Sequence, residues 1–237
     1  TPMDMTTDIG AGGNALPYRW RPMDFEYEGK KYTNERAIAT QQTGFWFVGQ
    51  ARGNYPDVIG GILWFGTDDA ATSYVTPIYS NTEKVPECFR QGNGNLLSYS
   101  ATSSFWINNR ISNACYRMYN IMAPYVRERI DKFENEQMEK VRQNDGKALE
   151  LFKKSMDSAE KVGKKKSLAY DVMTDTGASF AAVKRLLTSY SVKTAQDIFK
   201  QWQELEVTLT VKFIDGNVKA QNADGSFKHT DFSAGIP

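Results

Sequence analysis

The chain has 237 residues, of which 41% are hydrophobic and 24% charged, a composition typical of one globular domain or one lobe of a larger protein. Its 29 basic and 28 acidic side chains leave a formal net charge of +1, which excludes a broad field that would attract nucleic acid or an anionic membrane. No apolar run approaches the roughly 20 residues of a membrane-spanning helix, so we expect neither a nucleic-acid nor a membrane partner.

The beginning of the chain predicts irregular structure. Residues 1–10 have neither the basic patch nor the apolar core of a signal peptide, and the chain opens without an initiator methionine. We therefore expect that a segment upstream was removed. Residues 10–22 are rich in glycine and proline and predict an ordered loop. These glycines resemble half of a dinucleotide fingerprint, but no predicted strand precedes them and Pro17 interrupts the helix that should follow.

The next part of the chain predicts β-structure. Residues 25–35 alternate apolar and polar side chains around a central Glu-Gly pair, which predicts a small hairpin. Three runs rich in aromatic and β-branched residues follow, at 43–50, 60–66 and 73–79. Turn-forming residues separate them, so we expect sequential antiparallel strands. The first two runs are nearly continuously apolar and predict strands that are covered on both faces.

Helical patterns dominate the rest of the chain. Apolar residues recur at helical spacing from Phe105 to Met122, and Pro124 is expected to stop this helix. Residues 125–162 are strongly charged but keep an apolar stripe. They predict two amphipathic helices that meet near the turn-forming residues 144–146.

Two further helices are predicted over residues 178–187 and 194–205. Residues 207–216 are ambiguous, because their β-branched side chains favour a strand while their position continues a helical stripe. The three lysines at 164–166 are interpreted as a solvated face, and the tail after Gly216 is expected to be loose.

Side chains that usually carry hydrolytic or metal chemistry are scarce. The single histidine, His229, falls in the predicted loose tail, which argues against a Ser-His or Cys-His site. Cys115 lies on an apolar stripe and Cys88 in a loop, and both are predicted to be structural; a bridge between them stays open. Asp68 and Asp69 form an isolated pair, so we predict no metal and no cofactor.

Polar residues are concentrated just before and within the strand region. They have two open interpretations, a hydrogen-bonded sheet edge or the lining of an active site. The residues concerned are Arg19, Arg21, Asn34, Arg36, Thr40, Gln41, Gln42, Thr43 and Arg52.

Four linked motifs resemble the dipeptidase A family of cysteine peptidases, a branch of the N-terminal-nucleophile hydrolases related to penicillin V acylases and bile salt hydrolases. They read GAGGNALPYRWRPM, NERAIATQQTGFWFVGQAR, GGILWFGTDDAATSYVTPIY and PECFRQGNGNLLSYSATSSFW. The likeness runs from about Asp8 to about Tyr119 and returns weakly at 187–205 and 212–216.

The resemblance implies an α+β fold, namely part of an αββα sandwich with an antiparallel sheet and a helical C-terminal region. Residues 1–124 would supply the sheet and a covering helix, and residues 125–237 the mainly helical region with a loose tail. The remaining sheet would come from the N-terminal half of the same protein. That half would carry the nucleophile, a cysteine at the mature N-terminus, whose own α-amino group can act as the base.

The resemblance also implies a substrate, a dipeptide or short peptide, and roles for particular residues. Arg21 or Arg36 would support the thiolate or orient a substrate carboxylate. Gln42 and Thr43 would line the cleft as hydrogen-bond donors, with Arg52 among the substrate-binding candidates. Asp68 and Asp69 would meet the free amine of a dipeptide.

Two other functions remain open at this point. The chain could be a non-catalytic module that binds a peptide or sugar through Trp46, Trp64 and Trp106, although such tryptophans are more often part of a core. It could also be only an assembly piece. The sequence does not decide the dipeptide specificity or whether the protein forms a homo-oligomer. It also leaves two compartments open, the bacterial cytoplasm and the periplasm.

Overall fold

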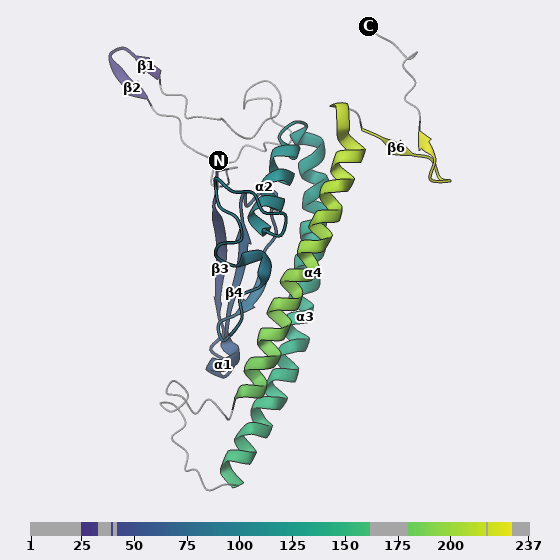
Figure 1. Cartoon of the computed structure of the whole chain (residues 1–237). Coiled ribbons are helices and arrows are strands. Elements are labelled where there is room, and N and C mark those ends of the chain that lie inside the picture. The colour runs from purple at the N-terminus through teal and green to yellow at the C-terminus, as the bar shows by residue number, and fades with distance from the viewer. Residues whose placement is uncertain (1–24, 33–38, 40–41, 162–179, 217, 229–237) are drawn as a thin grey trace.

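The computed structural model describes residues 25–32, 39, 42–161, 180–216 and 218–228, and Figure 1 shows their arrangement. A small antiparallel sheet lies against a pair of long helices, which confirms the predicted α+β class. The predicted loop at 10–22, the lysines at 164–166 and His229 lie outside the described residues. Within the described residues, no helix is both long and apolar enough to cross a membrane.

The predicted hairpin is confirmed. Strand β1 (Phe25–Tyr27) pairs antiparallel with β2 (Lys30–Tyr32). The two residues between them, Glu28 and Gly29, have φ angles of 50° and 73°. Positive φ at both central positions matches the twist of the flanking strands, and glycine adopts it without steric cost.

The predicted meander is confirmed as well. Strands β3 (Phe45–Ala51), β4 (Gly61–Thr67) and β5 (Thr76–Tyr79) form one antiparallel sheet in the order β3-β4-β5. The short helix α1 (Asp57–Gly60) lies in the connection between β3 and β4. Strand β3 is therefore an edge strand of the described sheet, and β4 is its centre.

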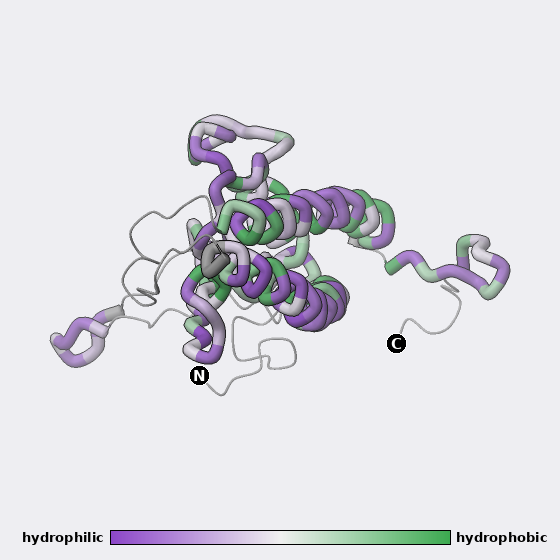
Figure 2. The backbone as a smooth tube through the Cα atoms, turned by 90° about the horizontal axis from the view of Figure 1, so that it is seen from below, coloured by the Kyte–Doolittle hydropathy of each residue, from purple (hydrophilic) through white to green (hydrophobic). Residues whose placement is uncertain are grey.

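Three longer helices follow the sheet and the one-turn 3-10 helix η2 (Glu87–Phe89). They are α2 (Ser104–Cys115), α3 (Tyr119–Lys161) and α4 (Ala181–Phe213). Helices α3 and α4 lie side by side along the sheet (Figure 1). Figure 2 shows hydrophilic stretches along both, interrupted by hydrophobic positions, as expected for helices with one face in a core. After α4 come η3 (Ile214–Gly216) and a small pair of strands, β6 (Ala220–Gln221) and β7 (Phe227–Lys228).

Several predicted helix boundaries are wrong. The helix predicted to stop at Pro124 ends at Cys115 instead, and Pro124 lies early in α3, where only the carbonyl one turn before it loses its hydrogen bond. Residues 144–146 do not separate two helices, because α3 continues through them. Residues 207–213 are helical and complete α4.

Two hydrophobic clusters hold these elements together, and α3 and α4 contribute to both. One cluster joins α2 to α3 and α4, with Ile111, Val126 and Ile198 fully buried. The other joins the sheet to the opposite end of the same two helices, through Ile62 and Leu187. Between the clusters the helices meet through a hydrogen bond from the Tyr190 hydroxyl to Gln137 Oε1, at 3.1 Å.

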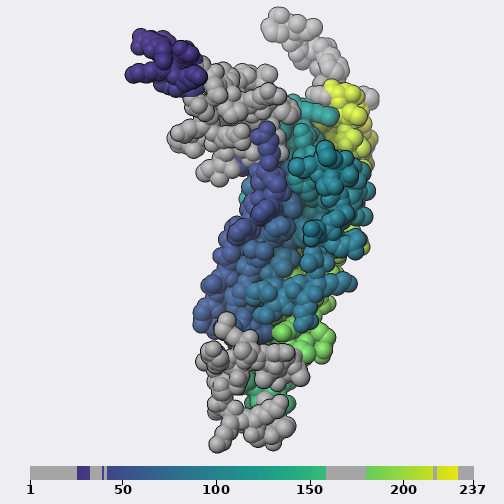
Figure 3. All heavy atoms as spheres, turned by 60° about the vertical axis from the view of Figure 1, so that its left-hand side comes forward, coloured from purple at the N-terminus to yellow at the C-terminus, as the bar shows by residue number. Residues whose placement is uncertain are grey.

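The prediction that β3 and β4 are covered on both faces is wrong for β3. One face of the sheet packs on α3 and α4 through β4 and β5, and on the other face Phe45 is 62% exposed and Phe47 57% exposed. Leu63 of β4 lies on this same face and is also exposed. Figure 3 shows the sheet residues at the molecular surface. The apolar character of β3 therefore has no explanation in the described part of this chain.

Candidate functional site

Of the predicted site residues, Arg21 and Arg36 lie outside the described residues. Gln42 is exposed and Thr43 half-buried, and both directly precede β3. Strand β4 runs antiparallel to β3, so it ends where β3 begins. The backbone N–H of Asp68 donates to the carbonyl of Gly44 at 3.1 Å. The structure thus brings the turn before β3 and the predicted acidic pair to the same end of the sheet.

The acidic pair occupies a tight turn directly after β4. Asp68 has a φ of 67°, in the left-handed region that aspartate adopts more readily than most residues. Asp68 is 0% exposed and Asp69 1% exposed, which is unusual for carboxylates. Such groups require hydrogen-bond donors in place of the lost water.

Helix α2 supplies most of these donors through polar side chains one turn apart, Ser104, Asn108 and Ser112. All three are fully buried. Asn108 Nδ2 donates to Thr67 Oγ1 at 3.0 Å, and Ser104 Oγ lies 3.1 Å from the same oxygen. Ser112 Oγ donates to Asp69 Oδ2 at 3.4 Å. The polar side of α2 therefore packs on the end of β4 and the turn after it.

Further contacts fix the two carboxylates separately. Asn109 Nδ2 donates to Asp68 Oδ1 at 2.9 Å. Asp69 Oδ1 accepts the backbone N–H of Ala71 at 2.9 Å, and its Oδ2 accepts the Tyr116 hydroxyl. The sequence analysis missed these α2 residues because it followed the apolar stripe of the helix. The signal was present as small polar residues recurring every fourth position within that pattern.

The two buried carboxyl groups have no described positive charge beside them. Burial raises the pKa of Asp68 to about 7, and the neighbouring Asp69 adds to the rise, although the bond from Asn109 opposes it. Asp68 Oδ2 is buried without a hydrogen-bond partner, and so is Asn108 Oδ1. Neither Asp68 nor Asp69 forms an ion pair with a described basic residue.

Arg52 lies at the opposite end of β3, where it ties the sheet to α3. Its guanidinium donates to the carbonyl of Ile59 at 2.7 Å and forms a buried salt bridge with Asp145. The Tyr79 hydroxyl donates to the other oxygen of Asp145 at 2.7 Å. Arg52 also lies over the Tyr55 ring, 4.4 Å from its centroid. These contacts support a structural role, and a role in substrate binding stays a prediction.

Cys88 and Cys115 are both free and buried, as the sequence predicts for structural cysteines. Burial raises the pKa of each thiol to about 12. Cys88 Sγ lies 3.8 Å from the carbonyl of Ala195, inside the cluster formed with α4. At neutral pH neither sulfur would be a thiolate, the form that acts as a nucleophile.

A comparison with models of protein families shows to which family the chain belongs. The model of peptidase family C69 matches residues 15–132, about half of the chain. The chain belongs to peptidase family C69. This membership confirms the resemblance to the dipeptidase A family, and it assigns a peptidase function of the cysteine type. A comparison with curated proteins gave no match.

The three tryptophans of the alternative function form hydrogen bonds within this C69 peptidase through their indole N–H groups. The Trp46 indole N–H donates to Ser73 Oγ at 2.8 Å, and Trp64 donates to Gln50 Oε1 at 3.0 Å. Trp106 donates to the carbonyl of Ser98 at 3.1 Å. Each indole N–H thus binds within the fold while its ring is half-buried, and a binding role for these rings stays a prediction.

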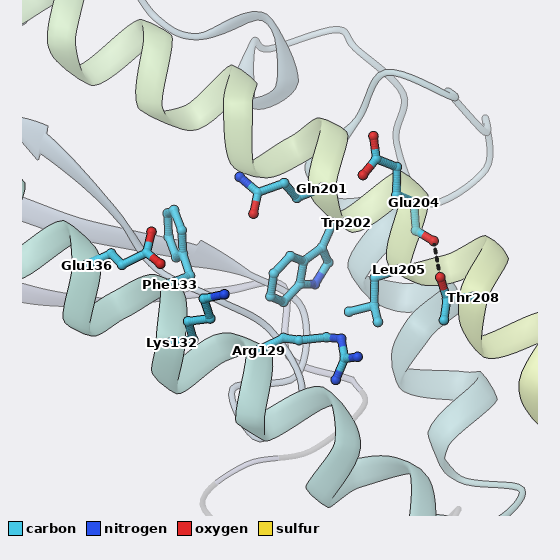
Figure 4. Close-up of a pocket in the computed structure, with 9 residues that line it drawn as sticks. All are labelled: Arg129, Lys132, Phe133, Glu136, Gln201, Trp202, Glu204, Leu205 and Thr208. Atoms are coloured by element: carbon cyan, nitrogen blue, oxygen red, sulfur yellow. Dashed lines mark hydrogen bonds between the residues drawn. The ribbon is translucent and has the colours of Figure 1, made fainter. Parts of the chain in front are cut away.

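A hollow of about 260 Å³ lies between α3 and α4 of the C69 peptidase (Figure 4). Its lining shares no residue with the predicted site. Figure 4 shows Trp202 at its centre, with Arg129 and Lys132 reaching in from α3. Glu136 and Glu204 add acidic groups, so the hollow has no preferred charge. The described residues also contain no group of three or more histidine, cysteine, aspartate or glutamate side chains that could hold a metal ion.

Proposed function

We propose that this chain is the C-terminal portion of a dipeptidase, which hydrolyses short peptides through an N-terminal cysteine located upstream of residue 1. The observation that carries the proposal is the burial of Cys88 and Cys115, whose pKa values of about 12 make both unsuited to attack a peptide bond. A cysteine peptidase still requires a reactive thiolate. Its most economical source is a cysteine outside this chain.

The proposed chemistry needs no histidine. The α-amino group of an N-terminal cysteine has a reference pKa of about 7.7–8.0, so it can take the thiol proton near neutral pH. The thiolate would add to the peptide carbonyl, and the tetrahedral intermediate would collapse to a thioester as the amine leaves with that proton. Water would then hydrolyse the thioester and release the second product.

The exposed sheet face supports an upstream partner from the same protein. Phe45, Phe47 and Leu63 form an apolar surface on the side opposite α3 and α4, and β3 is an edge strand of the sheet formed by the described residues. A second sheet packed on that face, as in an αββα sandwich, would bury these side chains. We propose that the N-terminal half supplies it.

The cleft would lie at the end of the sheet where β3 begins and β4 ends. Gln42 and Thr43 precede β3 there and would offer donors to the substrate carbonyl or the tetrahedral oxyanion. One well-placed donor of this kind contributes about 2.7–4 kcal/mol to the transition state. Arg21 or Arg36 would support the thiolate, and Asp68 and Asp69 would face the amino end of the dipeptide.

The deciding experiment uses the full-length protein and three single substitutions. Replacing the mature N-terminal cysteine with alanine should abolish dipeptide hydrolysis, whereas Cys88→Ala and Cys115→Ala should keep it once folding is verified by circular dichroism. Loss of turnover in a folded Cys88→Ala or Cys115→Ala protein, with the upstream variant still active, would refute the proposal. A parallel Arg36→Ala variant with near-normal turnover would remove Arg36 from the site.

A further inference from the structure

The turn after β4 has more hydrogen-bond acceptors than donors. Asp69 is satisfied at both oxygens by Ala71, Ser112 and Tyr116. Asp68 accepts from Asn109 at Oδ1, and the backbone of Asp69 also binds its carboxyl group, but its Oδ2 is buried and has no partner. Two adjacent carboxyl groups thus lie buried with no described basic residue to balance them.

A second orphaned acceptor lies at the same junction. Asn108 is held through Nδ2 by Thr67, the residue directly before Asp68. Its Oδ1 is buried and has no partner either. An unpaired buried polar group costs about 1–3 kcal/mol, and an unpaired charge costs more. Each of these two atoms lacks the donor or positive charge that would offset this cost.

We propose that Asp68 Oδ2 and Asn108 Oδ1 bind a small cation, either an inorganic monovalent ion or a primary ammonium group. Both oxygens are buried, so an occupant would have to be small, and a planar guanidinium would need more room. A divalent metal is not favoured, because the described residues contain no group of three or more carboxylate, histidine or cysteine side chains to hold it. Burial raises the pKa of Asp68, which is consistent with a buried carboxyl group that has no counter-charge beside it.

The cation can come from two sources that share this chemistry. One is a free ion such as potassium or ammonium. The other is the α-ammonium group of a peptide substrate, and this source rests on the proposed dipeptidase function. Binding there would make a free amino terminus a requirement for cleavage. Two measurements separate the sources.

The first measurement is thermal unfolding of the protein at pH 8, where Asp68 is mostly ionised. Potassium or ammonium chloride should raise Tm by about 2–4 °C relative to tetramethylammonium chloride at equal concentration. Asp68→Asn should abolish this difference. Asp157→Asn, an exposed aspartate in α3, is the matched control and should retain it.

The second measurement compares hydrolysis of a dipeptide with that of its N-acetyl derivative by the full-length enzyme. If the substrate supplies the cation, acetylation should lower kcat/KM by about 100-fold or more, because the buried acceptors would be left unpaired. In Asp68→Asn the penalty should shrink to a few-fold. Asp157→Asn should behave as the wild type.

The proposal is overturned if the wild type shows neither a small-cation stabilisation nor a penalty for N-acetylation. It is also overturned if Asp68→Asn retains whichever effect is found. Both wild-type comparisons are valid even if Asp68→Asn fails to fold, and Asn108→Leu then serves as the second variant. An inactive full-length protein would refute the dipeptidase proposal while leaving the unfolding test to decide the cation site.

Discussion

Asp68 combines two features that each oppose folding, a left-handed backbone and a buried carboxyl group. A carboxyl group whose pKa is raised in the folded state binds its proton more tightly there than in the unfolded chain. Its favourable contribution is complete below the unfolded pKa of about 4 and is lost as the pH rises through about 7. The site is therefore maintained at a cost in stability at neutral pH.

Asp68→Asn removes this pH dependence. In a buffer whose only cation is tetramethylammonium, the variant should match the wild type near pH 4 and exceed it by about 4 kcal/mol at pH 8. Urea denaturation at both pH values measures the difference. Equal stability of the two proteins at pH 8 would mean that the folded-state pKa of Asp68 is not raised.

Asp145 is the second buried carboxylate whose replacement is informative, because its partner Arg52 is nearly buried too. Asp145→Ala leaves the guanidinium without its counter-charge and should cost about 3–5 kcal/mol. The control is Asp131→Ala, which removes an exposed pair with Arg127 and should cost less than about 1 kcal/mol. Chemical denaturation tests both, and similar losses would contradict the structural role of Arg52.

At the residue scale, the sequence could predict which side chains are buried but not which distant residues they bind. Cys115 was predicted as a small buried hydrophobe from the apolar stripe around it, and it is buried. The contacts of Asn108 and Asn109 could not be predicted, because their partners lie about 40 positions earlier in the chain. Polar residues on a predicted helix are interpreted as facing solvent unless the buried acceptor that they bind is already known.

At the element scale, local turn propensity misplaced the centre of α3. Residues 144–146 favour turns when taken alone. Asp145 instead binds Arg52 and Tyr79 on the sheet, and this contact fixes the helix through the segment. The strands were predicted more accurately because β-branched and aromatic runs between turn formers are local signals.

Gly146 tests this explanation. It lies inside α3 with an exposed surface, and an added methyl group would meet nothing within 4 Å. Gly146→Ala should therefore raise the free energy of unfolding by about 0.5–1 kcal/mol, since alanine loses less backbone freedom in a helix. Denaturant unfolding provides the measurement. A destabilised variant would indicate that the backbone at this position departs from a regular helix.

At the scale of the whole molecule, the exposed face of the sheet determines behaviour in solution. Within the described residues β3 is an edge strand beside Phe45 and Phe47, and it offers a surface for pairing with another copy when the proposed N-terminal half is absent. We expect the isolated chain to self-associate. Light scattering on the purified chain measures this, and a monomer at all concentrations would contradict the expectation.

A substitution identifies the surface responsible. Phe47→Lys places a charge on the exposed sheet face and should shift the chain toward monomer. Leu97→Lys is the matched control, because Leu97 is 97% exposed but belongs to a loop outside the sheet. Equal effects of the two substitutions would mean that general surface hydrophobicity, and not the sheet, drives association.

The hydrogen bond between Tyr190 and Gln137 lies where one hydrophobic cluster gives way to the other. Sliding α4 along α3 by one turn would break this hydrogen bond and leave the buried Gln137 amide without it. The shift would cost far more than exchanging one apolar contact for another. This polar contact thus helps to set the alignment of two antiparallel helices, which an all-leucine seam would leave degenerate.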